Sequence, residues 1–186
     1  MSKTSVTTFR RSFLAEGLPD PLTRASSHLQ IFDNYFINTR LRSRRIRDPQ
    51  ANSIAHVLQL VSSNADTGCR IINTAELHLN EPELSLFDRF GGREIRKNRY
   101  FHEVDGRNWY FDIYLGEPHG LCIAIVDSLS EADAAAIEPP PFALFEITNN
   151  EFFEGASLVD RTAADIAAEV SNLGASDPIQ AHVADE

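Results

Sequence analysis

Cysteine is scarce in this chain, and no apolar run is long enough to cross a membrane. The two cysteines, Cys69 and Cys122, lie in separate apolar segments and fit neither a disulfide framework nor a metal-ligand spacing. No segment approaches the roughly 20 apolar residues that span a bilayer, and no apolar run typical of a signal peptide follows the first residues. We therefore expect two reduced thiols in a cytoplasmic protein without a membrane partner.

Basic residues are also in the minority. The chain has 17 Lys and Arg against 27 Asp and Glu, which gives a formal net charge of -10. Nucleic-acid binders draw most of their affinity from neutralising phosphates and commonly carry a net positive domain, so this composition argues against a nucleic-acid partner. The basic residues are concentrated in 40–47 and 93–99, which favours a local pocket for a small polyanion.

Several common catalytic motifs are missing. The sequence contains no G-x-x-x-x-G-K, no G-x-S-x-G and no H-x-x-x-H. Its 186 residues are enough for one hydrophobic core. We predict a single domain over 1–174, closed by a helix that Gly174 ends, and a disordered acidic tail over 175–186.

An arginine-rich strand is the most informative feature that is present. In the run 39–47, Arg40, Arg42 and Arg44 share one face of an extended chain. Like charges side by side repel, and guanidinium groups match phosphate oxygens in a bidentate way, so the row predicts a phosphorylated ligand. A solvated edge strand protected by charge is the alternative.

Most of the chain is typical of antiparallel strands separated by turns. The strand-like segments are 6–14, 29–36, 39–47, 54–61, 70–79, 95–103, 107–115, 121–127 and 142–149. Helical patterns occupy 81–90, 130–137 and 162–173, the last opened by a capping box of Thr162 and Asp165. The fold class predicted is α+β, with about eight strands in a closed or nearly closed barrel and small helices at its sides.

These segments resemble the CYTH domain, the family also called triphosphate tunnel metalloenzymes. The resemblance spans about residues 7–158 and rests on the order of several short pieces. They are Asp33-Asn34-Tyr35-Phe36, Arg40-Leu41-Arg42, Arg96-Lys97-Asn98-Arg99-Tyr100, Gly106, Trp109, Asp112, Gly116, Gly120-Leu121, Pro140-Pro141-Phe142 and Glu146-Ile147-Thr148.

The resemblance implies an eight-stranded antiparallel barrel whose lumen is a tunnel. In this family inward Arg and Lys side chains hold a triphosphate, and inward carboxylates hold a divalent metal such as Mg²⁺ or Mn²⁺. Members hydrolyse inorganic or organic triphosphates, and others form cyclic AMP. Carried over to this chain, the phosphate-binding residues are Arg40, Arg42, Arg44, Lys97 and Arg99, with Arg70 as an addition. The metal-binding residues are Asp112, Asp127 and Glu146.

The departures from the family pattern decide between binding and catalysis. The family's opening E-x-E-x-K signature is replaced by Thr8, Arg10 and Ser12. A strand that carries inward lysines in the family has His56, Leu58 and Leu60 on one face instead, and a glutamate pair is replaced by Ile125 and Asp127. Each lost carboxylate removes a ligand for a hard cation.

Three interpretations follow from these residues. The first is a degenerate member that binds a polyphosphate or nucleotide in the tunnel with weak or no hydrolysis. The second is a metal-dependent triphosphate phosphohydrolase that uses Asp112, Asp127 and Glu146. The third is a protein-interaction scaffold whose lumen is filled by its own side chains and salt bridges.

Overall fold

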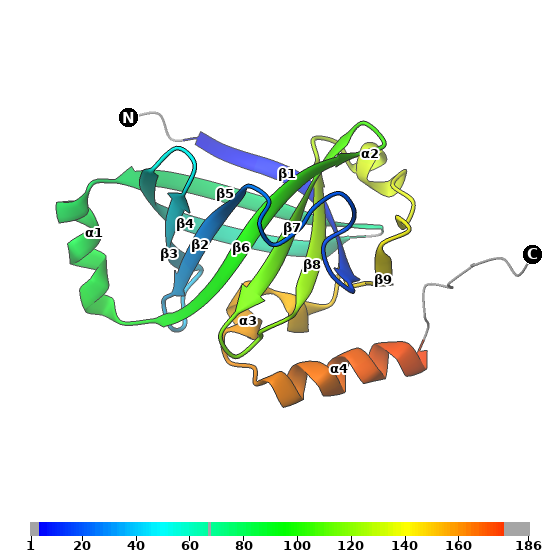
Figure 1. Ribbon diagram of the computed structural model, residues 1–186. Coiled ribbons are helices and arrows are strands. Elements are labelled where there is room, and N and C mark those ends of the chain that lie inside the picture. Colours follow the sequence, from blue (N-terminus) through cyan, green and yellow to red (C-terminus); the bar gives the residue numbers. More distant parts are fainter. Residues whose placement is uncertain (1–3, 67, 177–186) are drawn as a thin grey trace, which may run out of the picture.

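The strands form one antiparallel sheet that closes on itself (Figure 1). The computed structural model describes residues 4–66 and 68–176. Around the barrel the order is β5-β4-β3-β2-β6-β7-β8-β1, and β1 pairs back with β5. The strands are β1 (Thr4–Ala15), β2 (His28–Tyr35), β3 (Leu41–Asp48), β4 (Ser53–Asp66), β5 (Cys69–Leu79), β6 (Arg93–Val104), β7 (Arg107–Leu115) and β8 (Cys122–Ser128). The predicted eight-stranded barrel is confirmed.

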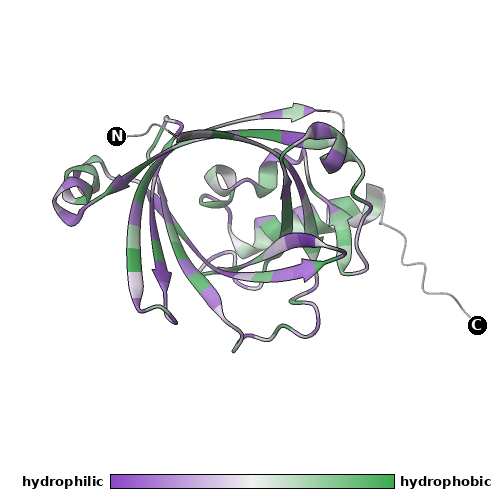
Figure 2. Ribbon diagram, turned by 90° about the horizontal axis from the view of Figure 1, so that it is seen from above, coloured by the Kyte–Doolittle hydropathy of each residue, from purple (hydrophilic) through white to green (hydrophobic). Residues whose placement is uncertain are grey.

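A ninth strand and several short helices complete the described chain. β9 (Ala143–Glu146) pairs with the end of β1, beyond the stretch of β1 that pairs with β5. The helices are α1 (Glu81–Phe87) with the 3-10 turn η1 (Asp88–Phe90), α2 (Glu131–Ala135), the 3-10 turn η2 (Glu151–Phe153), α3 (Gly155–Leu158) and α4 (Ala163–Ser176). Seen from above, the strands curve around a ring, and short helices lie across it (Figure 2). None of the helices in the described ranges is long and apolar enough to cross a membrane.

Tight turns fix the register of the hairpins. Asp105 and Gly106 both have positive φ, 51° and 71°, between β6 and β7, as a two-residue turn that matches the strand twist requires. The sequence predicted the bounds of β7. It placed the ends of other elements less well, because the last strand stops at Glu146 and not at residue 149.

Alternate residues of β1, β7 and β8 pack into two different hydrophobic clusters. Phe13 and Ala124 pack on the outer side with Trp109 and Phe111, whereas their chain neighbours Leu14 and Ile125 pack on the lumen side. Because both faces are covered, the segment from Cys122 to Val126 is apolar throughout and fully buried.

The lumen-side core fastens the last helices beneath the barrel. Leu158 of α3 is 0 % exposed and Ile166 of α4 is 8 % exposed in this cluster. The capping box opens α4, since Asp165 N donates to Thr162 Oγ1 at 3.2 Å and Thr162 N donates to Asp165 Oδ2 at 2.9 Å. α4 ends at Ser176, three residues beyond the predicted helical segment 162–173. The rest of the predicted tail, 177–186, lies outside the described residues.

Candidate anion-binding site

The arginine-rich strand turns two guanidinium groups into the barrel. Arg42 and Arg44 line an internal cavity of about 590 Å³, while Arg45 and Arg47 of the same strand point outward and are exposed. This alternation is the ordinary consequence of an extended backbone. Arg40 precedes β3, so the prediction that it lies on the strand is wrong; it is exposed and still lines the cavity.

Seven cationic side chains converge on the cavity from four strands and one loop. They are Arg10 of β1, Arg40, Arg42 and Arg44 at β3, Arg70 of β5, and Lys97 and Arg99 of β6. All five predicted phosphate-binding residues are thus brought together. Arg10 was identified in the sequence only as a departure, and the structure shows that it faces the lumen.

Asp33 is the carboxylate that holds the β3 arginines. It is 0 % exposed and accepts hydrogen bonds from Arg44 Nε at 2.6 Å and from Arg44 Nη2 at 2.7 Å. Arg42 Nη1 stands 3.8 Å from the same carboxylate. Arg42 also donates to Gln59 Oε1 at 2.6 Å and to Tyr35 Oη at 3.0 Å, so its orientation is fixed from three sides.

Asp112 is the carboxylate that holds the two cations of β6. It accepts from Arg99 Nε and Nη2, both at 2.7 Å, and Lys97 Nζ lies 2.6 Å from its Oδ2. Asp127 accepts from Arg10 Nε and Nη2, both at 2.8 Å, and from Tyr110 Oη at 2.8 Å. The guanidinium groups of Arg10, Arg44 and Arg99 are therefore each oriented by a carboxylate on a neighbouring strand.

Burial and pairing shift the pKa values of these groups in opposite directions. Burial alone would raise the pKa of Asp33 and of Asp112, but the cations beside them hold both pKa values well below the usual range. Burial lowers the pKa of Lys97 to about 8, a shift that Arg99 adds to and Asp112 opposes. The carboxylates are thus ionised at neutral pH, and Lys97 is the cation closest to losing its charge.

The cavity has more positive than negative groups. Six of its seven cations pair with four carboxylates, Asp33, Asp112, Asp127 and Glu154, so the seven cations exceed these four by three positive charges when Lys97 is protonated. The exposed Glu151 stands farther off, 4.0 Å from Arg70. Asp33 and Asp112 are 0 % exposed, so the cations stand between them and the cavity. Cationic side chains that cannot move away from one another favour an anion between them.

The three predicted metal ligands are not brought together. Asp112 and Asp127 are inside the barrel, but Glu146 of β9 lies on the outer face of β1, where Arg11 donates to it at 2.9 and 2.6 Å. Thr148 donates to the same carboxylate at 2.6 Å. Across residues 4–66 and 68–176 no three His, Cys, Asp or Glu side chains form a group that could hold a metal ion.

The lumen carboxylates also lack free oxygens for a metal. Both oxygens of Asp112 and both oxygens of Asp127 accept hydrogen bonds from arginine. Mg²⁺ and Mn²⁺ need carboxylate oxygens in a near-octahedral arrangement. The residues present do not fit the divalent metal that the family resemblance implies.

One strand faces the opposite way from the prediction. β4 pairs with β3 so that Gln59 lies opposite Arg42 and Val57 lies opposite Arg44, which places Val57, Gln59 and Val61 toward the lumen. The prediction that His56, Leu58 and Leu60 line the tunnel is wrong. Leu60 is 39 % exposed on the outside. The apolar part of the lumen is instead supplied by Val57 together with Ile31 and Ile125, as the side chains alternate.

The sequence reasoning did not identify several residues of this site. Asp33, Tyr35, Gln59 and Glu154 were not singled out as site residues. The register of β2 and β3 brings the first two to the site, because Asp33 lies opposite Arg44 and Tyr35 lies opposite Arg42; a two-residue turn between the predicted strands would have placed Asp33 opposite Arg42 instead. Glu154 carries no signal in the sequence, because its place depends on the tertiary path of the chain after β9.

Comparison with solved structures reveals the same barrel in another protein. A structure described as that of the inorganic triphosphatase NE1496 has a TM-score of 0.55 and 22% sequence identity, covering 83% of this chain and 95% of that chain. The chain has the barrel fold of NE1496. A second structure of NE1496 gives a TM-score of 0.56 at 21% identity over 83% of this chain and 99% of that chain. No protein-family model matches the chain, and no curated protein sequence matches it. The similarity to NE1496 supports the tunnel-type barrel that the CYTH resemblance implied.

Proposed function

We propose that the barrel binds a small polyphosphate, or the polyphosphate part of a nucleotide, and that it does so without metal-dependent hydrolysis. The observation that supports binding is the convergence of seven cations on one cavity, with an excess of three positive charges over the carboxylates in close contact. NE1496, which shares the fold, is described as an inorganic triphosphatase. A chain of phosphates offers several oxygens to several guanidinium groups at once, as these side chains require.

The second part of the proposal rests on the carboxylates. Phosphoryl transfer in this class of reaction depends on cations that spread the developing charge and on a group that positions the attacking water. Here the two lumen aspartates, Asp112 and Asp127, are held by Arg99 and Arg10 and offer no free pair of oxygens. The arginines can bind and orient a phosphate chain, whereas Asp112 and Asp127 have no oxygen without an arginine donor to hold a metal or to accept a proton from water.

A binding experiment tests the first part. Thermal-shift and calorimetric titrations with inorganic triphosphate, in the presence of EDTA, should show stabilisation of the folded chain. Ligand at 100 times its dissociation constant stabilises by about 2.7 kcal/mol. Parallel titrations with ATP would show whether an organic group is tolerated.

Arg42→Ala and Arg47→Ala form a matched pair for this test. Both remove one arginine from β3, but Arg42 lines the cavity and Arg47 is exposed on the outer face. A hydrogen-bonded ionic contact is worth roughly 1.5–3 kcal/mol, so Arg42→Ala should weaken binding by roughly 10- to 150-fold. Arg47→Ala should leave it unchanged. If millimolar triphosphate has no effect on the wild-type protein, the interaction scaffold becomes the better interpretation.

Phosphate release tests the second part. A malachite-green assay with triphosphate and added Mg²⁺ or Mn²⁺ should show no turnover above the protein-free rate. Steady release that grows with protein concentration and disappears in Arg42→Ala would contradict our proposal and favour a triphosphate phosphohydrolase.

A further inference from the structure

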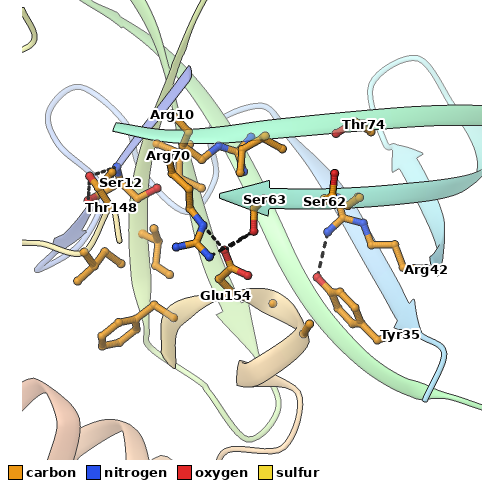
Figure 3. A pocket seen from close by; sticks show the side chains of 18 of the residues that line it. Arg10, Ser12, Tyr35, Arg42, Ser62, Ser63, Arg70, Thr74, Thr148 and Glu154 are labelled. Carbon is orange, nitrogen blue, oxygen red and sulfur yellow. Dashed lines mark hydrogen bonds and ion pairs between the residues drawn. The ribbon is translucent and has the colours of Figure 1, made fainter. Parts of the chain in front are cut away.

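Arg70 differs from the other cations of the cavity in the origin of its partner. Asp33, Asp112 and Asp127 lie on strands next to their arginines, whereas Glu154 lies at the start of α3, in the segment that crosses the end of the barrel. In Figure 3 Arg70 reaches down from β5 and Glu154 reaches up from this segment to meet it. Glu154 is also 35% exposed, while Arg70 is 6% exposed.

The contacts of Arg70 are incomplete. Its Nε forms an ion pair with Glu154 Oε1, although the two are not aligned for a hydrogen bond. Its Nη2 donates to Ser63 Oγ at 3.2 Å, and Ser63 Oγ donates in turn to Glu154 Oε1 at 3.2 Å. Nη1 is buried and has no hydrogen-bond partner among residues 4–66 and 68–176. A buried guanidinium N–H without an acceptor is costly, which indicates that the group is built for an acceptor that Glu154 does not supply.

Arg70 also belongs to the cationic wall, by which we mean the seven arginine and lysine side chains that line the cavity. It lies directly opposite Arg10 in the antiparallel pairing of β1 and β5, on the lumen face of both strands. Like charges in this position repel unless anions separate them. Asp127 neutralises Arg10 through strand β8, and Glu154 neutralises Arg70 from the cavity side. An anion that reaches Arg70 from the cavity must therefore take the place of the Glu154 carboxylate.

We propose that Arg70 is a further phosphate-binding residue, and that Glu154 is an internal anion that occupies its position until a polyphosphate displaces it. This inference rests on the proposed function and deepens it. A partly exposed carboxylate is released to water at little cost, whereas Asp33 and Asp112, at 0 % exposure, cannot be released without leaving buried charges. Glu154 is thus the carboxylate of this cavity that competes with the ligand.

The segment that carries Glu154 is held close to the rest of the site. A Cβ at Gly155 would collide with Tyr35 Oη, the atom that accepts a hydrogen bond from Arg42 at 3.0 Å. Glu154 and its neighbour therefore contact both ends of the cationic wall, Arg70 on one side and Tyr35 beside Arg42 on the other (Figure 3). Displacement of Glu154 therefore alters the part of the cavity wall, between Arg70 and Tyr35, that a bound polyphosphate would contact.

Glu154→Gln tests the proposal, with Glu151→Gln as its matched control. Both changes remove one negative charge from the same segment, but Glu151 stands 4.0 Å from Arg70 and is 85% exposed. Glu154→Gln should bind inorganic triphosphate about threefold or more tightly than the wild type, and Glu151→Gln should bind it unchanged. In the double variant with Arg70→Gln, the gain from Glu154→Gln should vanish.

The outcomes separate this inference from the proposed function. If the wild type binds triphosphate and Glu154→Gln binds it equally or more weakly, Glu154 is a structural clasp and the inference is wrong. If neither binds, the proposed function fails. Should Glu154→Gln not fold, Glu154→Asp keeps the charge but shortens the side chain, and it should also bind more tightly than the wild type. If Glu151→Gln gained the same affinity for triphosphate, the effect would come from long-range electrostatics, and the inference about Glu154 would be wrong.

Discussion

Lys97 carries a charge in the cavity that changes within an accessible range of pH. It is 7 % exposed, its Nζ lies 2.6 Å from Asp112 Oδ2, and it lines the cavity beside Arg99 and Arg44. Burial lowers its pKa from an ordinary value of 10.5 to about 8, while Asp112 opposes this shift and Arg99 adds to it. A bound polyphosphate would replace lost solvation with negative charge and raise this pKa again.

The size of the effect follows from the two pKa values. With a pKa of about 8 in the free protein, Lys97 is about 90% protonated at pH 7 and about 10% protonated at pH 9. If a bound polyphosphate restores the ordinary pKa of 10.5, affinity should fall about tenfold between pH 7 and pH 9. Over the same range, proton uptake on binding should rise from about 0.1 to about 0.9 per ligand.

Isothermal titration of inorganic triphosphate in buffers of different ionisation enthalpy measures both quantities. Lys97→Arg is the control, because arginine keeps its charge throughout this range. Titration of the ligand itself is common to both proteins, so the ratio of their dissociation constants isolates Lys97. The ratio of wild-type to variant dissociation constant should rise about tenfold from pH 7 to pH 9. A ratio that stays constant would show that Lys97 does not sense the ligand.

The depressed pKa has a second consequence, for the free protein. Between pH 8 and 10.5 the unfolded chain holds a proton on Lys97 that the folded chain has lost. The free energy of unfolding contributed by this group therefore rises with pH across that window, and the penalty for burying the charge is fully present below it.

Two further predictions concern stability. Asp112→Asn leaves Lys97 and Arg99 without their carboxylate, so the free energy of unfolding measured in urea should fall by roughly 3–5 kcal/mol. Saturating triphosphate should restore part of this loss. An unchanged urea midpoint would mean that the contacts of Asp112 with Lys97 and Arg99 add nothing to stability. Leu158→Ala truncates a side chain of α3 that is 0 % exposed and should lower the free energy of unfolding by roughly 2–5 kcal/mol. Leu129→Ala is the control, because this position is 85 % exposed and its effect should stay within about 0.5 kcal/mol. Equal effects of the two changes would show that α3 is not anchored in the core.

The fold was predictable because its signals are local. Alternating side chains, the Asp105-Gly106 turn and the capping box at Thr162 each act within a few residues, and each is found in the structure. The segment after β9 was not predicted as helical. Its short helices η2 and α3 are fixed by Leu158 and Phe153, which pack on the lumen side of the barrel, and no periodic pattern of such length could reveal this.

The sequence predicted the cations of the site, but it did not predict which strand faces and carboxylates lie beside them. A row of arginines on alternate positions stands out in any sequence, and Arg42, Arg44, Lys97 and Arg99 do face the cavity. The assignment of β4 failed by one residue. Val57, Gln59 and Val61 face the lumen, whereas Leu58 and Leu60 lie on the opposite face, and a slip of one residue exchanges the two faces of a strand.

The position of Arg10 on the lumen face of β1 has a physical consequence for the whole lumen. Arg10 neutralises Asp127 with two hydrogen bonds, both at 2.8 Å, and Arg99 neutralises Asp112 in the same way. Arginine cannot release its charge by losing a proton, so a divalent metal entering beside these aspartates would add its charge to a wall that already has an excess of positive groups. An anion entering the same cavity reduces that excess. The arginines that occupy the oxygens of these two aspartates therefore also favour the polyphosphate, which is why we infer a binding protein and not a metal-dependent hydrolase.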